Sequence, residues 1–137
     1  MAIAAVRFRV DFGQHEAVGP GKIALLEQIG RDGSLSQAAR ELNMSYRRAW
    51  LLLESLNVCF VEPVALTVKG GRGGGGATLT PFGRELIRAY RKLDAEIQAR
   101  AVRHLRPFLT RTRSLASARA AARARRGRAP VVHLKDR

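Results

Sequence analysis

Hydrophobic and polar positions alternate near the start of the chain and then change to a helical period. Every second residue from 6 to 12 is apolar, and this period of two predicts a half-buried strand. Pro20 favours the first turn of a helix, and apolar residues at helical spacing follow it until Gly30, where we predict the helix to end. The apolar positions are Val6, Phe8, Val10 and Phe12 in the strand and Ile23, Leu25, Leu26 and Ile29 in the helix.

Two shorter helical patterns follow, and each begins with a capping residue. Ser34 and Gln37 have the spacing of a capping box, in which the serine accepts from a backbone amide and the glutamine reaches back. After a tight break at Asn43, Ser45 can cap the next helix. We expect the apolar faces of both helices to be buried: Leu35, Ala38, Ala39 and Leu42 on the first, and Tyr46, Ala49, Trp50, Leu53 and Leu56 on the second.

A hairpin and a long helix are predicted after Pro63. Residues 64–68 and 77–79 are short strand-like runs on either side of a glycine tract that also contains Lys69 and Arg72. Thr80 and Pro81 then supply an N-cap and a first turn for a helix over about residues 81–106. Its apolar seam predicts pairing with a second helix, and a homodimer follows if that helix belongs to a second copy; the seam residues are Leu86, Tyr90, Leu93 and Ile97.

This order of elements is that of a winged helix-turn-helix, a mainly α fold with a small β component. In such folds the third helix enters the major groove of DNA and the hairpin contacts the flanking backbone or the minor groove. Helical geometry places Arg47, Arg48, Leu51 and Ser55 on the outward face of the third helix. The two arginines can reach guanine edges or phosphates, and the alternative is that they are ordinary solvated charges.

The charge of the chain points to a polyanionic partner. Among 137 residues, 25 are Lys or Arg and 11 are Asp or Glu, a net charge of +14 that suits nucleic acid or an anionic membrane surface. Residues 111–137 hold 9 of the basic residues and 1 acidic residue, in an Ala/Arg-rich run with few large apolar side chains. We therefore expect a folded domain over residues 1–110 and a tail that is disordered, or helical only when bound, and that attracts phosphates.

Enzymatic, metal and membrane functions find little support in the sequence. The Gly71-Gly73-Gly76 pattern is a poor dinucleotide fingerprint, because Thr78 to Pro81 separate it from the next helix. No hydrolase or metalloprotease motif occurs, and we expect no cofactor or metal site. Cys59 is read as a buried structural thiol, and no apolar run is long enough to span a membrane. A cytoplasmic, non-enzymatic protein is expected.

Three segments carry a family resemblance. Residues 33–39, residues 44–50 and the wing at residues 70–80 resemble, in the same order, the DNA-binding domain of the ModE family of molybdate-responsive transcription regulators. The resemblance covers roughly residues 5–105 and implies a dimer, paired through its N-terminal strands and long helices, on a pseudo-palindromic double-stranded DNA site. The candidate DNA-binding residues are Ser34, Ser36, Gln37, Ser45, Tyr46, Arg47, Arg48, Lys69 and Arg72.

The resemblance implies a sequence-specific regulator of transcription that controls molybdenum-related genes. The family's molybdate-binding region consists of two small β-barrel modules, and the 27 residues after Thr110 are too few for one, so direct molybdate binding is not expected. Two alternatives stay open: a nonspecific architectural nucleic-acid-binding protein driven by the basic tail, and an interaction module that recruits another protein through the apolar seam.

Overall fold

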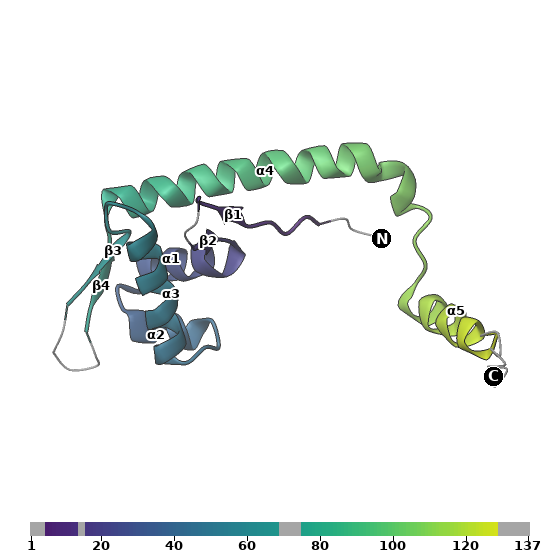
Figure 1. Cartoon of the computed structure of the whole chain (residues 1–137), viewed down its shortest axis with the longest axis horizontal. Helices are drawn as coiled ribbons and strands as arrows, with labels where there is room; N and C mark the ends of the chain where they lie inside the picture. Colours follow the sequence, from purple (N-terminus) through teal and green to yellow (C-terminus); the bar gives the residue numbers. More distant parts are fainter. Residues whose placement is uncertain (1–4, 14–15, 69–74, 129–137) are drawn as a thin grey trace, which may run out of the picture.

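The computed structural model describes residues 5–13, 16–68 and 75–128, and their arrangement is mainly α-helical with a small β component (Figure 1). The two sheets have two antiparallel strands each, β1 with β2 and β3 with β4. Helices α1 to α3 and the β3–β4 hairpin form a winged helix-turn-helix, as predicted. The elements are β1 (Val10–Asp11), β2 (Ala17–Val18), α1 (Pro20–Asp32), α2 (Leu35–Glu41), α3 (Tyr46–Cys59), β3 (Ala65–Thr67), β4 (Ala77–Leu79), α4 (Pro81–Leu109) and α5 (Leu115–Gly127).

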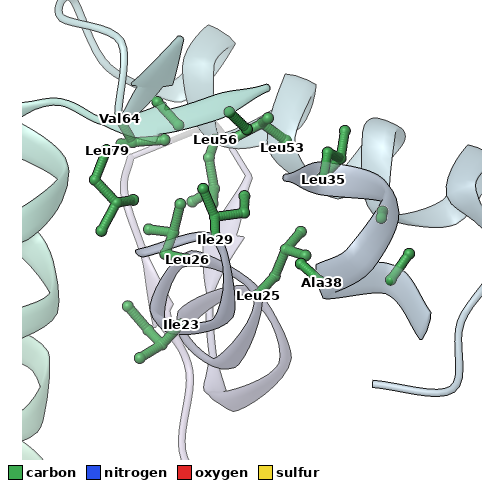
Figure 2. Packing of buried hydrophobic residues seen from close by; sticks show 14 of the residues in the cluster. Ile23, Leu25, Leu26, Ile29, Leu35, Ala38, Leu53, Leu56, Val64 and Leu79 are labelled. Carbon is green, nitrogen blue, oxygen red and sulfur yellow. The ribbon is translucent and has the colours of Figure 1, made fainter. Parts of the chain in front are cut away.

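The core lies between the first three helices and the hairpin. Ile23, Leu25 and Leu26 of α1 are fully buried, and Figure 2 shows Leu25 next to Ala38 of α2 and Leu26 on the side of Leu79 of β4. Burial of each such side chain stabilises the fold by about 1.5–3 kcal/mol, so this cluster is the main source of stability. All the apolar residues predicted for α1 and the first three of those predicted for α2 are buried.

The capping serines are placed as predicted, with one difference. The Oγ of Ser34 accepts from the amide of Gln37 at 3.2 Å, and the Oγ of Ser45 accepts from the amide of Arg48 at 3.1 Å. Gln37 does not complete the capping box, because its Nε2 donates to Glu41 at 3.1 Å along the same helix. An i, i+4 partner on an exposed helix face has replaced the reach back to Ser34.

Helix α1 runs two residues beyond the end predicted at Gly30, to Asp32. The residue that caps it is Gly33, whose φ of +64° is the left-handed conformation typical of a helix C-cap, and whose amide donates to the carbonyl of Ile29 at 2.9 Å. Gly30 instead allows a close approach, since a Cβ there would lie 2.8 Å from Cδ1 of Leu79. Because Gly30 and Gly33 lie within one turn of each other, the sequence pattern alone does not show which of them ends the helix.

The N-terminal segment forms less strand than predicted. Within this segment only β1 pairs with another strand, and the backbone of Val6 and Phe8 bonds to side chains of α4 instead. Gln98 bonds both backbone groups of Val6, accepting from its amide at 2.9 Å and donating to its carbonyl at 2.6 Å. The hydroxyl of Tyr90 donates to the carbonyl of Phe8 at 2.8 Å, and the two rings stack with centroids 4.8 Å apart. Burial, followed by the nearby charge of Asp94, raises the pKa of Tyr90.

The hairpin and the long helix α4 are joined at Thr80. Its hydroxyl donates to the carbonyl of Pro63 at 2.6 Å and accepts from the amide of Gly83 at 3.0 Å, so one oxygen closes the base of the hairpin and caps α4. The amide of Thr80 also donates to the carbonyl of Val64 at 3.0 Å. Gly83 lies so near this carbonyl that a Cβ would stand 2.0 Å from the oxygen.

The tail was expected to be disordered, or helical only when bound, and the structure has a helix over residues 115–127. These residues form helix α5, in which Ser114 is the N-cap and accepts from the amide of Ser117 at 3.2 Å. Alanine and arginine are both strong helix formers, and this local propensity makes a helix without a core. None of its residues is buried.

Replacing Gly83 with alanine is expected to destabilise the protein by about 2 kcal/mol or more, because the new methyl group would force α4 away from Val64. Gly21→Ala is the matched control: it lies in the first turn of α1 with nothing within 4 Å of its added Cβ, and should be neutral or stabilising by up to about 1 kcal/mol. Urea denaturation of both variants measures the difference. Equal stabilities would mean that α4 does not pack closely on the hairpin.

Candidate nucleic-acid interface

The turn between α2 and α3 fixes the geometry of the helix-turn-helix. Asn43 adopts a φ of +53°, a left-handed conformation that asparagine tolerates better than most residues. The amide of Asn43 donates to the carbonyl of Arg40 at 3.1 Å, and the amide of Met44 donates to the carbonyl of Ala39 at 3.0 Å. The chain thus leaves α2 and enters α3 with its backbone groups bonded, and the relative direction of the two helices is set.

Helix α3 buries a narrower face than the sequence pattern predicted. Ala49, Leu53 and Leu56 are buried, whereas Tyr46 is 57% exposed and Trp50 is 45% exposed. The prediction that both aromatic side chains belong to the core is therefore wrong. At about 100° per residue, the three buried residues occupy an arc of about 60°, and Trp50 and Tyr46 lie outside it. The contact of α3 with α1 and α2 is too narrow to cover them.

The exposed face of α3 combines positive charge with aromatic surface. Arg47 and Arg48 are exposed as predicted, and within the described residues neither side chain forms an ion pair or a hydrogen bond. Leu51, at 49% exposure, also lies on this face. Tyrosine and tryptophan carry apolar rings with one polar hydrogen-bonding group, which is the surface that stacks on or packs against nucleic-acid bases and sugars.

The three candidate residues of α2 are engaged within the helix. Ser34 is the N-cap, Ser36 accepts from Nη2 of Arg40 at 3.3 Å, and Gln37 donates to Glu41. Ser34 also forms a β-bridge with Gly76, which brings the base of the wing to the start of α2. Lys69 and Arg72, the candidates on the wing, lie outside the described residues.

Asn57 ties the wing to α3, and sequence reasoning missed it. Its Oδ1 accepts from the amide of Val64 at 2.8 Å, and its Nδ2 donates to the carbonyl of Ala65 at 3.3 Å. The side chain therefore satisfies two backbone groups at the start of β3 and fixes the hairpin relative to the recognition helix. The available signal was an asparagine between the apolar residues Leu56 and Val58 in the last turn of the helix, a few residues before a strand.

The predicted seam along α4 is divided between the chain's own core and its surface. Tyr90 is buried beneath Phe8, while Leu86 and Ile97 are half-buried and Leu93 is 39% exposed. Beside them lies a shallow apolar groove of about 160 Å³, which is lined by Val10, Phe12, Val18, Leu86, Ala89, Tyr90 and Leu93. The N-terminal segment thus forms one wall of the groove and α4 forms the other.

Other site types have little support within the described residues. The interpretation of Cys59 as a buried thiol is wrong in degree: the residue is half-buried, and its Sγ lies 3.6 Å from the carbonyl oxygen of Glu16. Over residues 5–13, 16–68 and 75–128, no group of three or more His, Cys, Asp or Glu residues could hold a metal ion. Nor does any helix in these ranges have the length and apolar character to span a membrane.

Curated proteins similar to this chain include two with molybdenum in their names and a DNA-binding regulator of transcription. The molybdenum-pterin-binding protein MopB of Rhodobacter capsulatus is 45% identical over 80 residues, which are 58% of this chain and 30% of that protein. The molybdenum transport protein ModE of Azotobacter vinelandii is 39% identical over 93 residues, or 68% of this chain and 34% of that protein. The DNA-binding transcriptional dual regulator ModE of Escherichia coli K12 is 40% identical over 82 residues, or 60% and 31%.

The extent of these matches is partial. This chain spans about a third of the length of the curated relatives that it matches. No protein-family model matches it.

Because Trp50 lies on the surface, Trp50→Ala should destabilise the protein by only about 1 kcal/mol, far less than the 3–5 kcal/mol typical of a buried tryptophan. Leu53→Ala, on the buried side of the same helix, should cost at least about 2 kcal/mol. Thermal or urea denaturation of the two variants compares them. A larger cost at Trp50 than at Leu53 would show that the tryptophan packs in the core.

Proposed function

Because the chain belongs to the ModE family, we propose that it is a transcription regulator that binds double-stranded DNA in a sequence-dependent manner. The observation that carries the proposal is the outward face of α3. Its core-facing residues are buried, yet Tyr46, Arg47, Arg48 and Trp50 remain exposed, and the two arginines have no ionic partner among the described residues. A surface that combines basic and aromatic side chains is typical of a site that binds nucleic acid, because it can contact both the phosphates and the bases or sugars.

In this proposal the first turns of α3 enter the major groove. An arginine can donate two parallel hydrogen bonds to O6 and N7 of guanine, and such a pair contributes about 1–3 kcal/mol of discrimination against other bases. The hydroxyl oxygen of Ser45 accepts from the amide of Arg48, and the hydroxyl hydrogen is left free to donate to a phosphate. The remaining free amides of the first turn and the positive end of the helix dipole also favour a phosphate there.

The wing would contact DNA beside the site of α3. Asn57 and the bridge between Ser34 and Gly76 hold the base of the hairpin against the helix-turn-helix, so the two elements would approach DNA as one rigid body. Lys69 and Arg72 are the basic residues that the sequence places at its tip. A contact of this kind goes to the backbone or the minor groove and adds affinity more than base preference.

We also propose that the protein acts as a homodimer. The apolar groove between the N-terminal segment and α4, together with the exposed side chain of Leu93, would be covered by the same surface of a second copy. A two-fold dimer places its two recognition helices on a pseudo-palindromic site, with half-sites about one helical turn of DNA apart.

The names of the relatives suggest which genes the protein would control. The names of MopB and of the ModE proteins refer to molybdenum-pterin binding, to molybdenum transport or to the regulation of transcription. We propose a cytoplasmic, non-enzymatic regulator of molybdenum-related genes. The segment of each relative that this chain matches is about a third of its length, and the proposal rests on that segment alone.

Selection of binding sites from a random duplex library is the test of the proposed function. The purified protein should enrich a two-fold symmetric motif with half-sites about one helical turn apart. Arg48→Ala is expected to relax base preference and to weaken binding to the selected site by about 1–3 kcal/mol, while Arg72→Ala should weaken binding evenly across sequences. Arg88→Ala, an equal charge change on the exposed side of α4, serves as the control.

Absence of any enriched motif would contradict the proposal. A protein that binds all duplexes alike would then be a nonspecific architectural protein, for which the basic tail supplies the attraction. Unchanged binding by both Arg48→Ala and Arg72→Ala would place the DNA-binding surface elsewhere on the molecule.

The dimer is tested by Leu93→Glu, which puts a charge on the exposed apolar surface of α4 and should convert the dimer to a monomer. Ala95→Glu introduces the same charge at an exposed position about 200° around the helix and should leave the dimer intact. Sedimentation equilibrium of both variants and the parent measures the masses. A parent that sediments as a monomer at micromolar concentration would contradict the proposed dimer.

A further inference from the structure

Helix α5 presents an unusually basic surface that the helix-turn-helix does not use. Every large side chain of α5 is exposed, and no acidic residue occurs between Thr110 and Arg128. Within the described residues, none of the arginines of this segment forms an ion pair. The segment therefore carries a concentrated positive charge with no compensating group on the same chain in the described structure.

Three of these arginines lie along one side of the helix. Arg119, Arg123 and Arg126 are spaced by four and three residues, and at about 100° per residue they fall within an arc of about 60°. The distance from the first to the third along the axis is about 10 Å. We call these three residues the arginine stripe. Arg125 and Arg128 lie outside this arc, and Arg113 precedes the helix.

We propose that α5 is a second DNA-contacting element, which binds the phosphate backbone of the duplex through the arginine stripe and carries no base preference. The inference rests on the proposed function of the helix-turn-helix. Guanidinium groups form bidentate, charge-assisted hydrogen bonds with phosphates, and a row of them on a helix can follow a phosphate strand. Contacts of this kind position a protein on DNA without reading its sequence.

The arrangement of the helices supports one duplex as the shared partner. In Figure 1, α5 and the helix-turn-helix lie on the same side of the long helix α4, near its opposite ends. Residues 110–114 tether α5 to the far end of α4, roughly 44 Å along that helix from the helix-turn-helix, a distance that about 13 base pairs of a duplex held by α3 would span. A tethered second contact raises the effective concentration of its partner and strengthens overall binding.

The composition of α5 disfavours a membrane surface. Helices that lie in a lipid interface have a wide face of large apolar side chains. In α5 the side opposite the arginine stripe carries small side chains and one charge, and Leu115 is the one large apolar residue of the whole helix; the opposite side has Ser117, Ala120, Ala121, Ala124 and Arg125. What remains is electrostatic attraction to phosphates, which a duplex that extends from α3 toward the C-terminal end of α4 would supply.

The test compares two variants of equal charge. The stripe variant replaces Arg119, Arg123 and Arg126 with glutamine, and the matched variant replaces Arg113, Arg125 and Arg128 with glutamine. Glutamine has a helix propensity close to that of arginine, so α5 should be retained in both, as circular dichroism can verify. Fluorescence anisotropy then measures binding of the full chain to the selected duplex, with long flanks, over a series of salt concentrations.

The slope of log affinity against log salt is negative, and the stripe variant should reduce its magnitude by about two to three units. The matched variant should reduce this magnitude by less than about one unit. Trimming the flanks of the duplex should remove the difference, and base preference should be unchanged in both. Equal slopes for the two variants would overturn the inference and leave the proposed function intact. Failure of the parent to bind a specific duplex would instead overturn the proposed function, and the inference with it.

A second pair of variants tests whether α5 acts as a helix. Ala121→Pro breaks the helix and preserves every charge, and it should lower the salt slope as the stripe variant does. Leu115→Pro places proline at the first helical position, where it is tolerated, after a Ser114 whose ψ of 161° suits a residue before proline. Parent-like binding of Ala121→Pro would overturn the inference. So would a stripe variant that loses affinity for single-stranded RNA but not for the duplex.

Discussion

The hydroxyl group of Thr80 is the point on which the arrangement of the molecule depends. By donating to Pro63 and accepting from Gly83, it joins the closing end of the hairpin to the first turn of the longest helix. Gly83 makes this junction possible, since a side chain there would collide with the carbonyl of Val64. Asn57 extends the same network from the hairpin to the recognition helix. The wing, α3 and α4 therefore have fixed relative positions that no single helix or strand could set by itself.

The starts of the helices could be predicted from sequence because the interactions that define them are local. Ser34, Ser45 and Thr80 each cap a helix by accepting from an amide three residues later, and a short side chain followed by a periodic apolar pattern suffices to indicate this. The order of the elements then indicated a winged helix-turn-helix. The exposed positions of Arg47 and Arg48 followed from the helical period alone.

Most features that could not be predicted from the sequence depend on tertiary contacts. Whether Trp50 is buried depends on the width of the contact that α3 makes with two other helices. The periodicity of the sequence does not reveal this width. The role of Gly30 also depends on a tertiary contact: its lack of a side chain allows Leu79 to pack closely, and it does not end the helix. The backbone of the N-terminal segment bonds to Gln98, far along the chain, so an alternating pattern suggested more strand than forms. In α5, intrinsic helix propensity outweighed the lack of a core.

Trp50 is the chain's one tryptophan, and it lies half-exposed on the face of α3 that we propose for DNA. The indole fluorescence of the whole molecule therefore originates from a single site, next to Tyr46, Arg47 and Leu51. The emission of a solvated indole changes when a base or sugar displaces the water around it, and excitation at the long-wavelength edge of the indole band, where tyrosine does not absorb, isolates this one signal. The unlabelled protein thus carries its own optical reporter at the surface that matters for its proposed function.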